Sequence, residues 1–587
     1  MMLPVITFLL AAATATDQPS GLYVASYEAY RSPVSGFELK RSDSGWSGLL
    51  DGEPMVIQSE TEGTIRFELP GGEAFIGTTV DGRLTGFWRR PAHDYAGQAF
   101  STPLRFRQTG QSTWTAKPAS LEEDFMIFHY FGEDEGGPFV AIRNPERNAI
   151  GASSRYRWAQ EEHGSGELFV GEAENRWSRS LSYNSAKDEV VSGWAWSADS
   201  SLLRRSTEAE AARFYPRVGS FDGLSRVPEL KDGWQVSSLT EAEISAAPLT
   251  TLIESIASSD PTAGRPDMIH SLLVAHKGKL VLEEYFHGYD RNDTHDLRSA
   301  AKTYAPLLAG ALIHDGLELN KDTLVMPILR KRFPDLPQGD ARDRITFGNL
   351  LSHQSGLACG NGQDGAPPGN EDTLWAQKEN FWLFSARLPM VAEPGTRYHY
   401  CSGSIHLAAG VLAIMTGREL FELIEEKLMQ PLDIPHYHWN VTPNGQAYFG
   451  GGAQLLPRDF LKMGQVVLDG GRWRGHQVLD PAWNTTSLEK TVEINPETTE
   501  TTPEEFAQNY ILSADGLGWH LIDIKAGERS YQSYYASGNG GQLVFVLPEL
   551  ELVVGMTGGQ YNWGSVWNTW PHRFIGGHII PAITESN

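Results

Sequence analysis

A serine and a lysine three positions apart, Ser299 and Lys302, could form a catalytic nucleophile and its base. They stand in the stretch HDLRSAAKTY (295–304), which opens a run that predicts a helix. On a helix, residues at this spacing lie one turn apart on the same face. A serine hydroxyl is a poor nucleophile until a base takes its proton, and a lysine is such a base only when its surroundings lower its pKa. The helix N-terminus adds a backbone N–H that can stabilise an oxyanion.

The spacing alone is weak evidence, because serine and lysine are common residues. The chain holds a second copy of the pattern, Ser487 and Lys490, in a polar stretch. On spacing alone Ser299 is no better a candidate than Ser487. An ordinary polar start to an ordinary helix is the alternative interpretation.

Four ordered blocks that follow Ser299 distinguish it from Ser487. They are ITFGNLLSHQSGL (345–357), PGTRYHYCSGSIHLAAGVLAIMTG (394–417), GGGAQLLPRDFLKMGQVVLDGGRWRGHQVLDPAWN (450–484) and YYASGNGGQLVFVLPELELVVGMTGG (534–559). In the order and spacing of these blocks the chain resembles the serine β-lactamase-related hydrolases, a family that includes class C β-lactamases, penicillin-binding D-Ala-D-Ala peptidases, family VIII esterases and 6-aminohexanoate-dimer hydrolases. The resemblance covers residues 230–587 and implies an α/β (α+β) domain of the serine β-lactamase-like, penicillin-binding transpeptidase-like type, in which helices flank an antiparallel sheet.

The resemblance implies catalytic roles for three residues. Ser299 matches the family nucleophile and Lys302 its lysine partner. The second family motif is Tyr-x-Asn, with the tyrosine six residues after the Pro of a Pro-Gly pair, and counting from Pro394 gives Tyr400. A tyrosine oxygen near amines can move protons between nucleophile and leaving group. At the position of the family's asparagine the chain has Ser402.

The third family motif, Lys/His-Thr/Ser-Gly, precedes an apolar run that ends in Pro-Glu. Counting back from that proline gives Ala536, Ser537 and Gly538, so the hydroxyl and the glycine are kept and the cation is absent. By the family's geometry, the backbone N–H of Asn539 is a second oxyanion donor, paired with the N–H of Ser299.

The two departures from the family motifs bear on the substrate. In the family, the motif-two amide and the motif-three cation are implicated in holding the amide and carboxylate groups of β-lactams. The resemblance and these two departures therefore imply a serine hydrolase that forms an acyl-enzyme on Ser299 with a small ester, amide or peptide, rather than an efficient β-lactamase. The alternatives are a non-catalytic penicillin-binding-like protein of the cell envelope, and a D-amino-acid peptidase or β-lactamase.

The elements that must position these residues begin near residue 230. The segment 248–258 has the apolar spacing of a helix, and IHSLLVAHKGKLVLEEYF (269–286) predicts two strands around a turn at Lys277-Gly278. The run APLLAGALIHDG (305–316) predicts an apolar-faced helix that ends at Gly316. These elements belong to the predicted hydrolase domain, residues 230–587.

The chain before this domain has a different composition and residue pattern. Residues 20–225 are rich in aromatic residues, Thr, Ser and Gly, in short alternating runs broken by turn signals such as Asp81-Gly82. Regular short strands of this kind predict an all-β antiparallel barrel or sandwich domain. We find no catalytic motif in it. The segment IRNPERN (142–148) is interpreted as a loop that ends a strand, and a functional segment is the alternative.

Charge and composition exclude several partner classes. The net charge of −25 argues against a nucleic-acid partner, and no run approaches the 20 or so apolar residues of a transmembrane helix. No metal or organic cofactor is implied, because His436 and His438 alternate on one face without a third ligand to which the sequence points. No feature of the sequence specifies an oligomeric state.

The first residues predict export. The stretch MMLPVITFLLAAATATDQ has the length of a signal-peptide apolar region, and Ala13-Thr14-Ala15 is a cleavage site of small residues. Residues 1–15 are therefore predicted to be a signal peptide, which would place the protein in the periplasm or outside the cell. The stretch lacks the basic residues of a typical leader, so a disordered or misassigned start is the alternative.

The resemblance also implies a disulfide. Cys359 follows LLSHQSGLA, which in the family ends near the pocket rim, and Cys401 directly follows Tyr400. In an exported protein these neighbours can oxidise if their Cα atoms lie within about 7 Å. Two buried small hydrophobic residues are the alternative interpretation.

Overall fold

The computed structural model covers the chain from its first strand to its last helix. It describes residues 18–584, apart from gaps at 32–35, 44, 62–63, 69–73, 81–82, 91–98, 117–121, 144–152, 161–165, 170–178, 195–199, 218, 220, 361–366, 505 and 507–512. The predicted signal peptide, the Asp81-Gly82 turn and most of the 142–148 segment lie outside the described residues.

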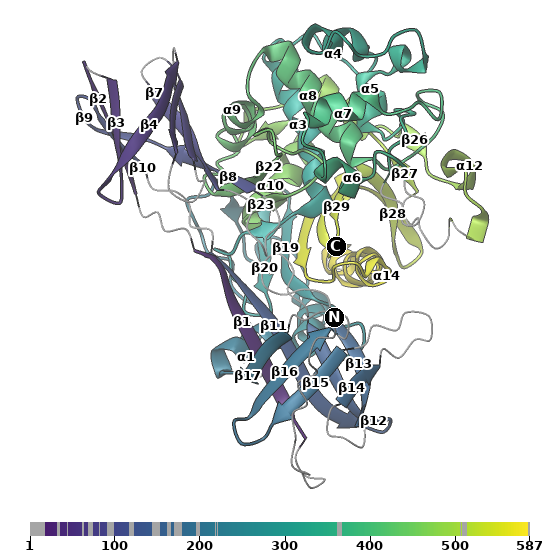
Figure 1. The fold of residues 1–587 in the computed structure, drawn as a ribbon. Helices are drawn as coiled ribbons and strands as arrows, with labels where there is room; N and C mark the ends of the chain where they lie inside the picture. Colours follow the sequence, from purple (N-terminus) through teal and green to yellow (C-terminus); the bar gives the residue numbers. More distant parts are fainter. Residues whose placement is uncertain are drawn as a thin grey trace, which may run out of the picture.

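Eight N-terminal strands close into an antiparallel barrel, which lies at the bottom of Figure 1. Closure leaves no open sheet edge. Its interior packs apolar side chains such as Tyr23, Phe131, Val140 and Leu203. In barrel order the strands are β1 (Gly21–Arg31), β11 (Glu122–Asp134), β12 (Gly137–Arg143), β13 (Ser153–Gln160), β14 (Gly166–Phe169), β15 (Arg179–Asn184), β16 (Glu189–Trp194) and β17 (Ser200–Arg205).

The strands between β1 and β11 form a second, open sheet, drawn in purple in Figure 1. The prediction of antiparallel strands over 20–225 is confirmed, but they are divided between two sheets instead of one barrel or sandwich. The strands are β2 (Phe37–Ser42), β3 (Gly45–Leu50), β4 (Glu53–Thr61), β5 (Thr64–Glu68), β6 (Ala74–Val80), β7 (Arg83–Arg90), β8 (Ala99–Arg105), β9 (Arg107–Gly110) and β10 (Thr113–Ala116).

This second sheet continues into the hydrolase unit. Strand β8 pairs with β22 (Tyr437–Val441), with Ser101 opposite Trp439, and β22 pairs in turn with β23 (Ala453–Leu455). The last strand, β21 (His295–Asp296), pairs with β23. A twelve-stranded sheet therefore runs from the N-terminal region to the residues that immediately precede Ser299.

The hydrolase unit is built on a nine-stranded sheet. All its strand pairs are antiparallel except β18 with β20. The predicted turn joins β19 and β20, where Lys277 and Gly278 have φ of 51° and 75°. In sheet order the strands are β18 (Gln235–Val236), β20 (Lys279–Tyr285), β19 (Ile269–His276), β31 (Leu552–Gly558), β30 (Gln542–Leu547), β29 (Arg529–Gly538), β28 (His520–Ala526), β27 (Ala514–Asp515) and β26 (Val492–Glu493).

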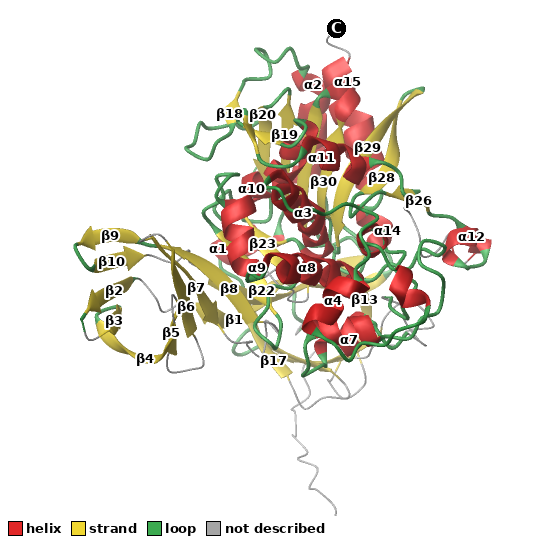
Figure 2. Cartoon of the chain, turned by 90° about the horizontal axis from the view of Figure 1, so that it is seen from above, coloured by secondary structure: helices red, strands yellow, loops and turns green. Residues whose placement is uncertain are grey.

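Successive residues of β30 point into two different cores, as the period of two in a strand requires. Leu543 and Phe545 join the core that includes α2 (Ala246–Ala257), η5 (Pro571–Ile579) and α15 (Ile580–Thr584). Val544 and Val546 join the larger core that contains α3 (Tyr304–His314), α8 (Ser402–Thr416) and α10 (Pro457–Leu468). Figure 2 shows these helices around the sheet, and the predicted fold, an antiparallel sheet flanked by helices, is confirmed.

One helix in the N-terminal region was missed by the sequence analysis. Helix α1 (Glu208–Phe214) begins with a capping box, in which the Thr207 side chain accepts from the N–H of Glu210 and the Glu210 carboxylate accepts from the N–H of Thr207. The pattern Thr-x-x-Glu was the signal that could have revealed it. None of the helices in the described part of the chain is long and apolar enough to span a bilayer.

The remaining described elements are short, and most of them connect or cover the main layers. They are α4 (Met326–Arg332), α5 (Phe347–Leu351), α6 (Glu371–Trp375), α7 (Phe381–Arg387), α9 (Leu420–Ile424), α11 (Pro481–Leu488), α12 (Pro496–Thr499), α14 (Gly564–Trp567), η1 (Arg298–Thr303), η2 (Ala341–Arg344), η3 (Glu425–Met429), η4 (Pro548–Leu550), β24 (Arg472–Trp473) and β25 (His476–Gln477).

Candidate active site

Ser299 and Lys302 lie in contact at the start of the predicted helix. This first part is the 3₁₀ helix η1, and the α-helix α3 follows it from Tyr304 to His314. Lys302 is 4% exposed, and its Nζ donates to Ser299 Oγ at 2.9 Å and to the carbonyl of Gly450. The hydroxyl and the amine are therefore within direct proton-transfer distance.

The backbone just before the nucleophile has an uncommon conformation. Arg298 has a φ of 50°, in the left-handed region that costs a non-glycine residue energy. Its N–H donates to the Asp296 carboxylate at 2.9 Å, and its guanidinium lies 4.7 Å from the centre of the Tyr561 ring. The N–H of the preceding residue, Leu297, donates to the Ala453 carbonyl at 2.8 Å. These contacts hold the turn that presents Ser299.

Tyr400, the third residue to which the resemblance assigns a catalytic role, faces the amine of Lys302. The Lys302 Nζ lies 4.9 Å from the centre of its ring. The neighbouring Tyr398 is instead buried, in a small apolar cluster with Val492 and Ile494. Counting from the Pro-Gly pair thus selected the tyrosine that the structure places beside Lys302.

His353 packs against the segment that contains Tyr400 and Cys401. Its ring lies 4.6 Å from that of Tyr400, and its Nδ1 accepts a hydrogen bond of 3.1 Å from the N–H of Cys401. Burial lowers the pKa of His353 well below its usual range, and the nearby Lys302 and His520 lower it further. A neutral His353 matches its role as an acceptor for the backbone, so it positions Tyr400.

The third motif meets η1 at the end of β29. A side chain at Gly538 would collide with the Leu297 carbonyl and come within 3.1 Å of the Ala300 nitrogen, so only glycine allows this approach. Ser537 precedes it, half-buried. The Asn539 side chain is tied to Asn562, donating to its Oδ1 at 2.9 Å and accepting from its N–H at 2.8 Å. The oxyanion role of the Asn539 N–H stays a prediction.

The two departures from the family motifs are both buried. Ala536 is inaccessible on β29, and Ser402 is 1% exposed in the first turn of α8. A substrate contact by the Ser402 side chain stays a prediction.

The second Ser-x-x-Lys pattern does not assemble a site. Ser487 is buried in α11, where its Oγ donates to the Asn484 carbonyl at 2.9 Å. Lys490 points to Glu493 instead, at 3.9 Å. Tertiary structure thus distinguishes two patterns that are equivalent in sequence.

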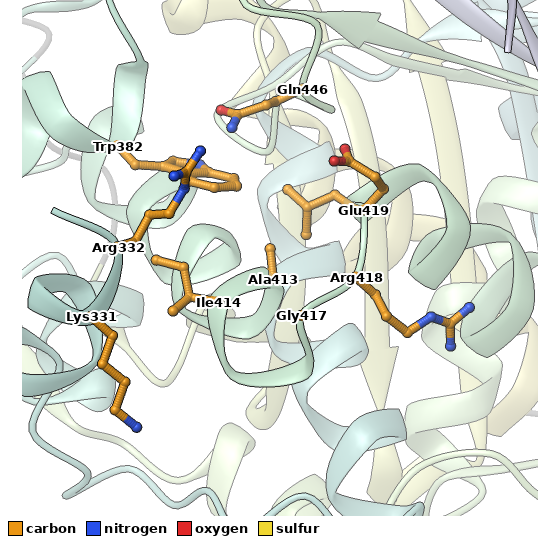
Figure 3. A pocket seen from close by; sticks show the side chains of 10 residues that line it. Lys331, Arg332, Trp382, Ala413, Ile414, Gly417, Arg418, Glu419 and Gln446 are labelled. Carbon is orange, nitrogen blue, oxygen red and sulfur yellow. The ribbon is translucent and has the colours of Figure 1, made fainter. Parts of the chain in front are cut away.

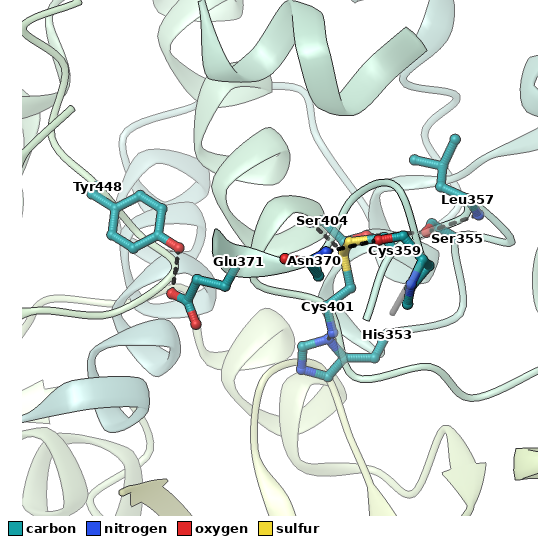
Figure 4. The surroundings of a disulfide bond; sticks show 10 residues. His353, Ser355, Leu357, Cys359, Asn370, Glu371, Cys401, Ser404 and Tyr448 are labelled. Atoms are coloured by element: carbon teal, nitrogen blue, oxygen red, sulfur yellow. Dashed lines mark hydrogen bonds between the residues drawn. A yellow bond between two sulfur atoms is a disulfide. The ribbon is translucent and has the colours of Figure 1, made fainter. Parts of the chain in front are cut away.

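A disulfide joins Cys359 to Cys401, with a Cα–Cα distance of 5.5 Å (Figure 4). Cys401 also caps α8, because its sulfur accepts from the N–H of Ser404 at 3.1 Å. A second link nearby joins Ser355 Oγ to Ser404 Oγ at 3.0 Å. The disulfide therefore fixes the residue next to Tyr400 to a segment 42 positions earlier in the chain.

We expect reduction of this disulfide to lower the free energy of unfolding by about 3–4 kcal/mol, the chain-entropy value for a loop of this length. Urea denaturation with and without reductant measures the change. A Cys359→Ser/Cys401→Ser double variant is the control and should be insensitive to reductant. Two freely alkylated thiols in non-reduced protein from an oxidising compartment would contradict the pairing.

A cavity of about 400 Å³ lies away from these motifs, among the helices α4, α7 and α8 and the residues that follow α8 (Figure 3). None of Ser299, Lys302 or Tyr400 lines it. Its walls are made by Lys331, Arg332, Trp382, Ala413, Ile414, Gly417, Arg418, Glu419, Leu420 and Gln446.

The described residues contain no group of three or more His, Cys, Asp or Glu placed to hold a metal ion. The rings of His436 and His438 lie 5.4 Å apart, and His438 Nδ1 is 2.7 Å from Thr102 Oγ1 on β8. His438 therefore takes part in the junction with the N-terminal sheet.

Sequence reasoning missed a histidine–carboxylate pair beside Tyr400. His520 Nδ1 lies 2.5 Å from Asp515 Oδ1, and the His520 ring centre lies 6.4 Å from that of Tyr400. The two residues are five apart in the stretch SADGLGWHL, which contains none of the family motifs named above. The signal was weak, because only the pairing of β27 with β28 makes them face each other.

Comparisons with known proteins identify the family of the C-terminal part of the chain. The family model described as beta-lactamase matches residues 264–562. A 6-aminohexanoate-dimer hydrolase from Paenarthrobacter ureafaciens is 24% identical over 307 residues, which cover 48% of this chain and 76% of that protein.

Two solved structures are similar at low identity. A putative 6-aminohexanoate-dimer hydrolase from Bacillus anthracis has a TM-score of 0.45 and 16% identity, covering 62% of this chain and 90% of that one. A family VIII carboxylesterase has a TM-score of 0.41 and 15% identity, covering 57% and 96%. Because the family match spans more than half of the 587 residues, this chain belongs to the beta-lactamase family and is a serine hydrolase related to its esterases and amidases.

Proposed function

We propose that this protein is an exported hydrolase that forms an acyl-enzyme on Ser299 and prefers an ester or small amide to a β-lactam. The observation that carries the proposal is the contact of Lys302 Nζ with Ser299 Oγ at 2.9 Å, beside the ring of Tyr400. A serine that contacts a buried amine, with a tyrosine ring beside that amine, provides a nucleophile and two candidate proton-transfer groups for acyl transfer.

The reaction has two balanced steps. Ser299 Oγ attacks the acyl carbon, its proton passes to the Lys302–Tyr400 pair, and the same proton leaves on the alcohol or amine as the ester or amide bond breaks. Water then attacks the acyl-enzyme, gives its proton to the same pair, and the proton returns to Ser299 as the acid is released. The backbone N–H groups of Ser299 and Asn539 are the proposed oxyanion donors.

The preference for esters is inferred from the two buried departures. An alanine at position 536 cannot hold a substrate carboxylate, and a buried Ser402 is shorter than the amide that it replaces. A simple ester needs neither contact. A linear amide is the second candidate, since the relative with 24% identity is named a 6-aminohexanoate-dimer hydrolase.

Export is supported by two features. The first residues have the pattern of a leader, and the disulfide beside Tyr400 requires an oxidising compartment to persist. Edman sequencing or intact-mass measurement of protein secreted by the native cell would locate the cleavage expected after Ala15.

We expect purified protein to hydrolyse short p-nitrophenyl esters with a kcat/KM at least about a hundredfold above that for nitrocefin, the scale of a lost positioned group. D-amino-acid amides and a linear amide complete the panel. Comparable kcat/KM values for nitrocefin and the esters would refute the preference. Absence of any turnover and of labelling by a fluorophosphonate or a β-lactam probe would favour a non-catalytic binding protein.

A further inference from the structure

In the family, two motif residues place positive charge near the motif-two tyrosine. This chain keeps the lysine, Lys302, but has Ala536 at the position of the third-motif cation. A tyrosine oxygen takes part in proton transfer more readily when nearby positive charge stabilises its deprotonated form. Lys302 Nζ, 4.9 Å from the ring centre, supplies one such charge. A second neighbour of Tyr400 is His520, which lies on the strand next to the third motif, with 6.4 Å between the two ring centres.

His520 is placed by sheet register. In the pairing of β28 with β29, its Cα partner is Tyr535, the residue before Ala536. In the pairing of β27 with β28, its partner is Asp515, so the two side chains lie on one face of the sheet. Its ring centre is 6.4 Å from that of Tyr400 and 5.3 Å from that of Tyr535.

Asp515 fixes the orientation of the imidazole. The two side chains are 3% and 13% exposed, and Nδ1 of His520 donates to Asp515 Oδ1 at 2.5 Å. A bond at Nδ1 leaves Nε2 as the atom free to face other groups. Burial raises the pKa of the Asp515 carboxyl, while His520 and a hydrogen bond with Tyr398 act in the opposite direction. Asp515 therefore holds the imidazole in one orientation beside Tyr400 and Tyr535.

The field of His520 reaches the catalytic centre. Both Lys302 and His520 lower the pKa of the buried His353, whose ring lies 4.6 Å from Tyr400. Lys302 on η1 and His520 on β28 are therefore both neighbours of Tyr400 and His353. Three further titratable groups lie against His520: Asp515 on β27, Tyr535 on β29 and Tyr400 from the segment before α8. Tyr398 from the same segment bonds Asp515.

We propose that His520, oriented and charged by Asp515, is a positioning residue for Tyr400 and supplies the positive charge that Ala536 does not. The inference rests on the proposed function. His520 keeps its own protons throughout: the proton that Ser299 loses passes to Tyr400 or Lys302 and then to the leaving group, and His520 stabilises Tyr400 in its deprotonated form.

The test is the pH dependence of ester hydrolysis in matched variants. His520→Gln removes the charge and keeps a similar volume, whereas His520→Lys restores a cation. We expect His520→Gln to lower kcat by about tenfold with little change in KM, and to move the acidic limb of the kcat profile up by about one pH unit, the equivalent of that factor. His520→Lys should return the limb toward its wild-type position.

Two further variants control for structural effects. Asp515→Asn keeps the imidazole and should reproduce the limb shift of His520→Gln; it also serves if His520→Gln does not fold, as judged by thermal unfolding. His578→Gln changes a partly buried histidine of η5, which bonds the Pro248 carbonyl of α2 at 3.2 Å. This variant should leave the pH profile unchanged.

The outcomes separate the inference from the proposed function. The role of His520 is overturned if the glutamine and lysine variants lose kcat equally and the acidic limb of the pH profile does not move. It is also overturned if the limb does not move in Asp515→Asn. Ser299-dependent turnover would remain in either case. A wild-type protein without ester turnover overturns both.

Discussion

Ser299→Ala is expected to abolish hydrolysis of an activated ester such as p-nitrophenyl butyrate. The hydroxyl is the one atom that would bond to the acyl carbon, and Lys302 Nζ already contacts it at 2.9 Å. The same change should also abolish covalent labelling by a fluorophosphonate probe, which intact-mass spectrometry measures. Activity and labelling should disappear together because both use the Ser299 Oγ.

The matched control is Ser487→Ala. Ser487 has the same Ser-x-x-Lys spacing, but its hydroxyl bonds the Asn484 carbonyl and its lysine points elsewhere. Full activity is expected in this variant. Equal turnover in wild type and Ser299→Ala would exclude the mechanism.

The second large effect is expected at Lys302. Lys302→Ala should lower kcat/KM by at least about a hundredfold, the contribution of a positioned proton-transfer group. Lys302→Arg should be nearly as inactive, because a guanidinium keeps the charge but does not give up its proton at working pH. Steady-state kinetics of both variants, with Lys490→Ala as the control, measure the effect.

Retained activity in Lys302→Arg would assign the lysine an electrostatic role and leave proton transfer to Tyr400 alone. Because Lys302 is buried, thermal unfolding of each variant must show that the fold survives. The comparison of arginine with alanine then separates charge from basicity.

The placement of Lys302 beside both Ser299 and Tyr400 could be predicted, because Ser299 is three residues from Lys302 and Tyr400 matches a family motif at a fixed count from a Pro-Gly pair. Ser299 and Lys302 meet within one turn, and Tyr400 stands at a fixed distance from the Pro394-Gly395 pair. The turn itself differs from the prediction, since the residues form a 3₁₀ segment before the α-helix. A spacing of three brings the side chains together in either conformation.

The pairing of the N-terminal strands could not be predicted. Strands β2–β10 and β11–β17 have similar alternating patterns. Backbone hydrogen bonds between strands do not depend on residue type, so the pattern does not show which strands pair. The contact of Ser101 with Trp439, far apart in the chain, is of this kind. His520 was missed for the same reason, because its role depends on which strands lie beside β28.

The part of the chain that matches the family, residues 264–562, shares a sheet with the N-terminal strands, because the sheet passes from β8 through β22 and β23 to β21. We therefore expect the matched part not to fold by itself. A fragment that begins near residue 230 would leave β22 with an unpaired edge, while Phe87 of β7 would be lost from the main core. Open edges of this kind pair with other chains and promote aggregation. Dividing the gene between residues 221 and 234 would therefore separate β8 from its partner β22 and expose an edge of the sheet.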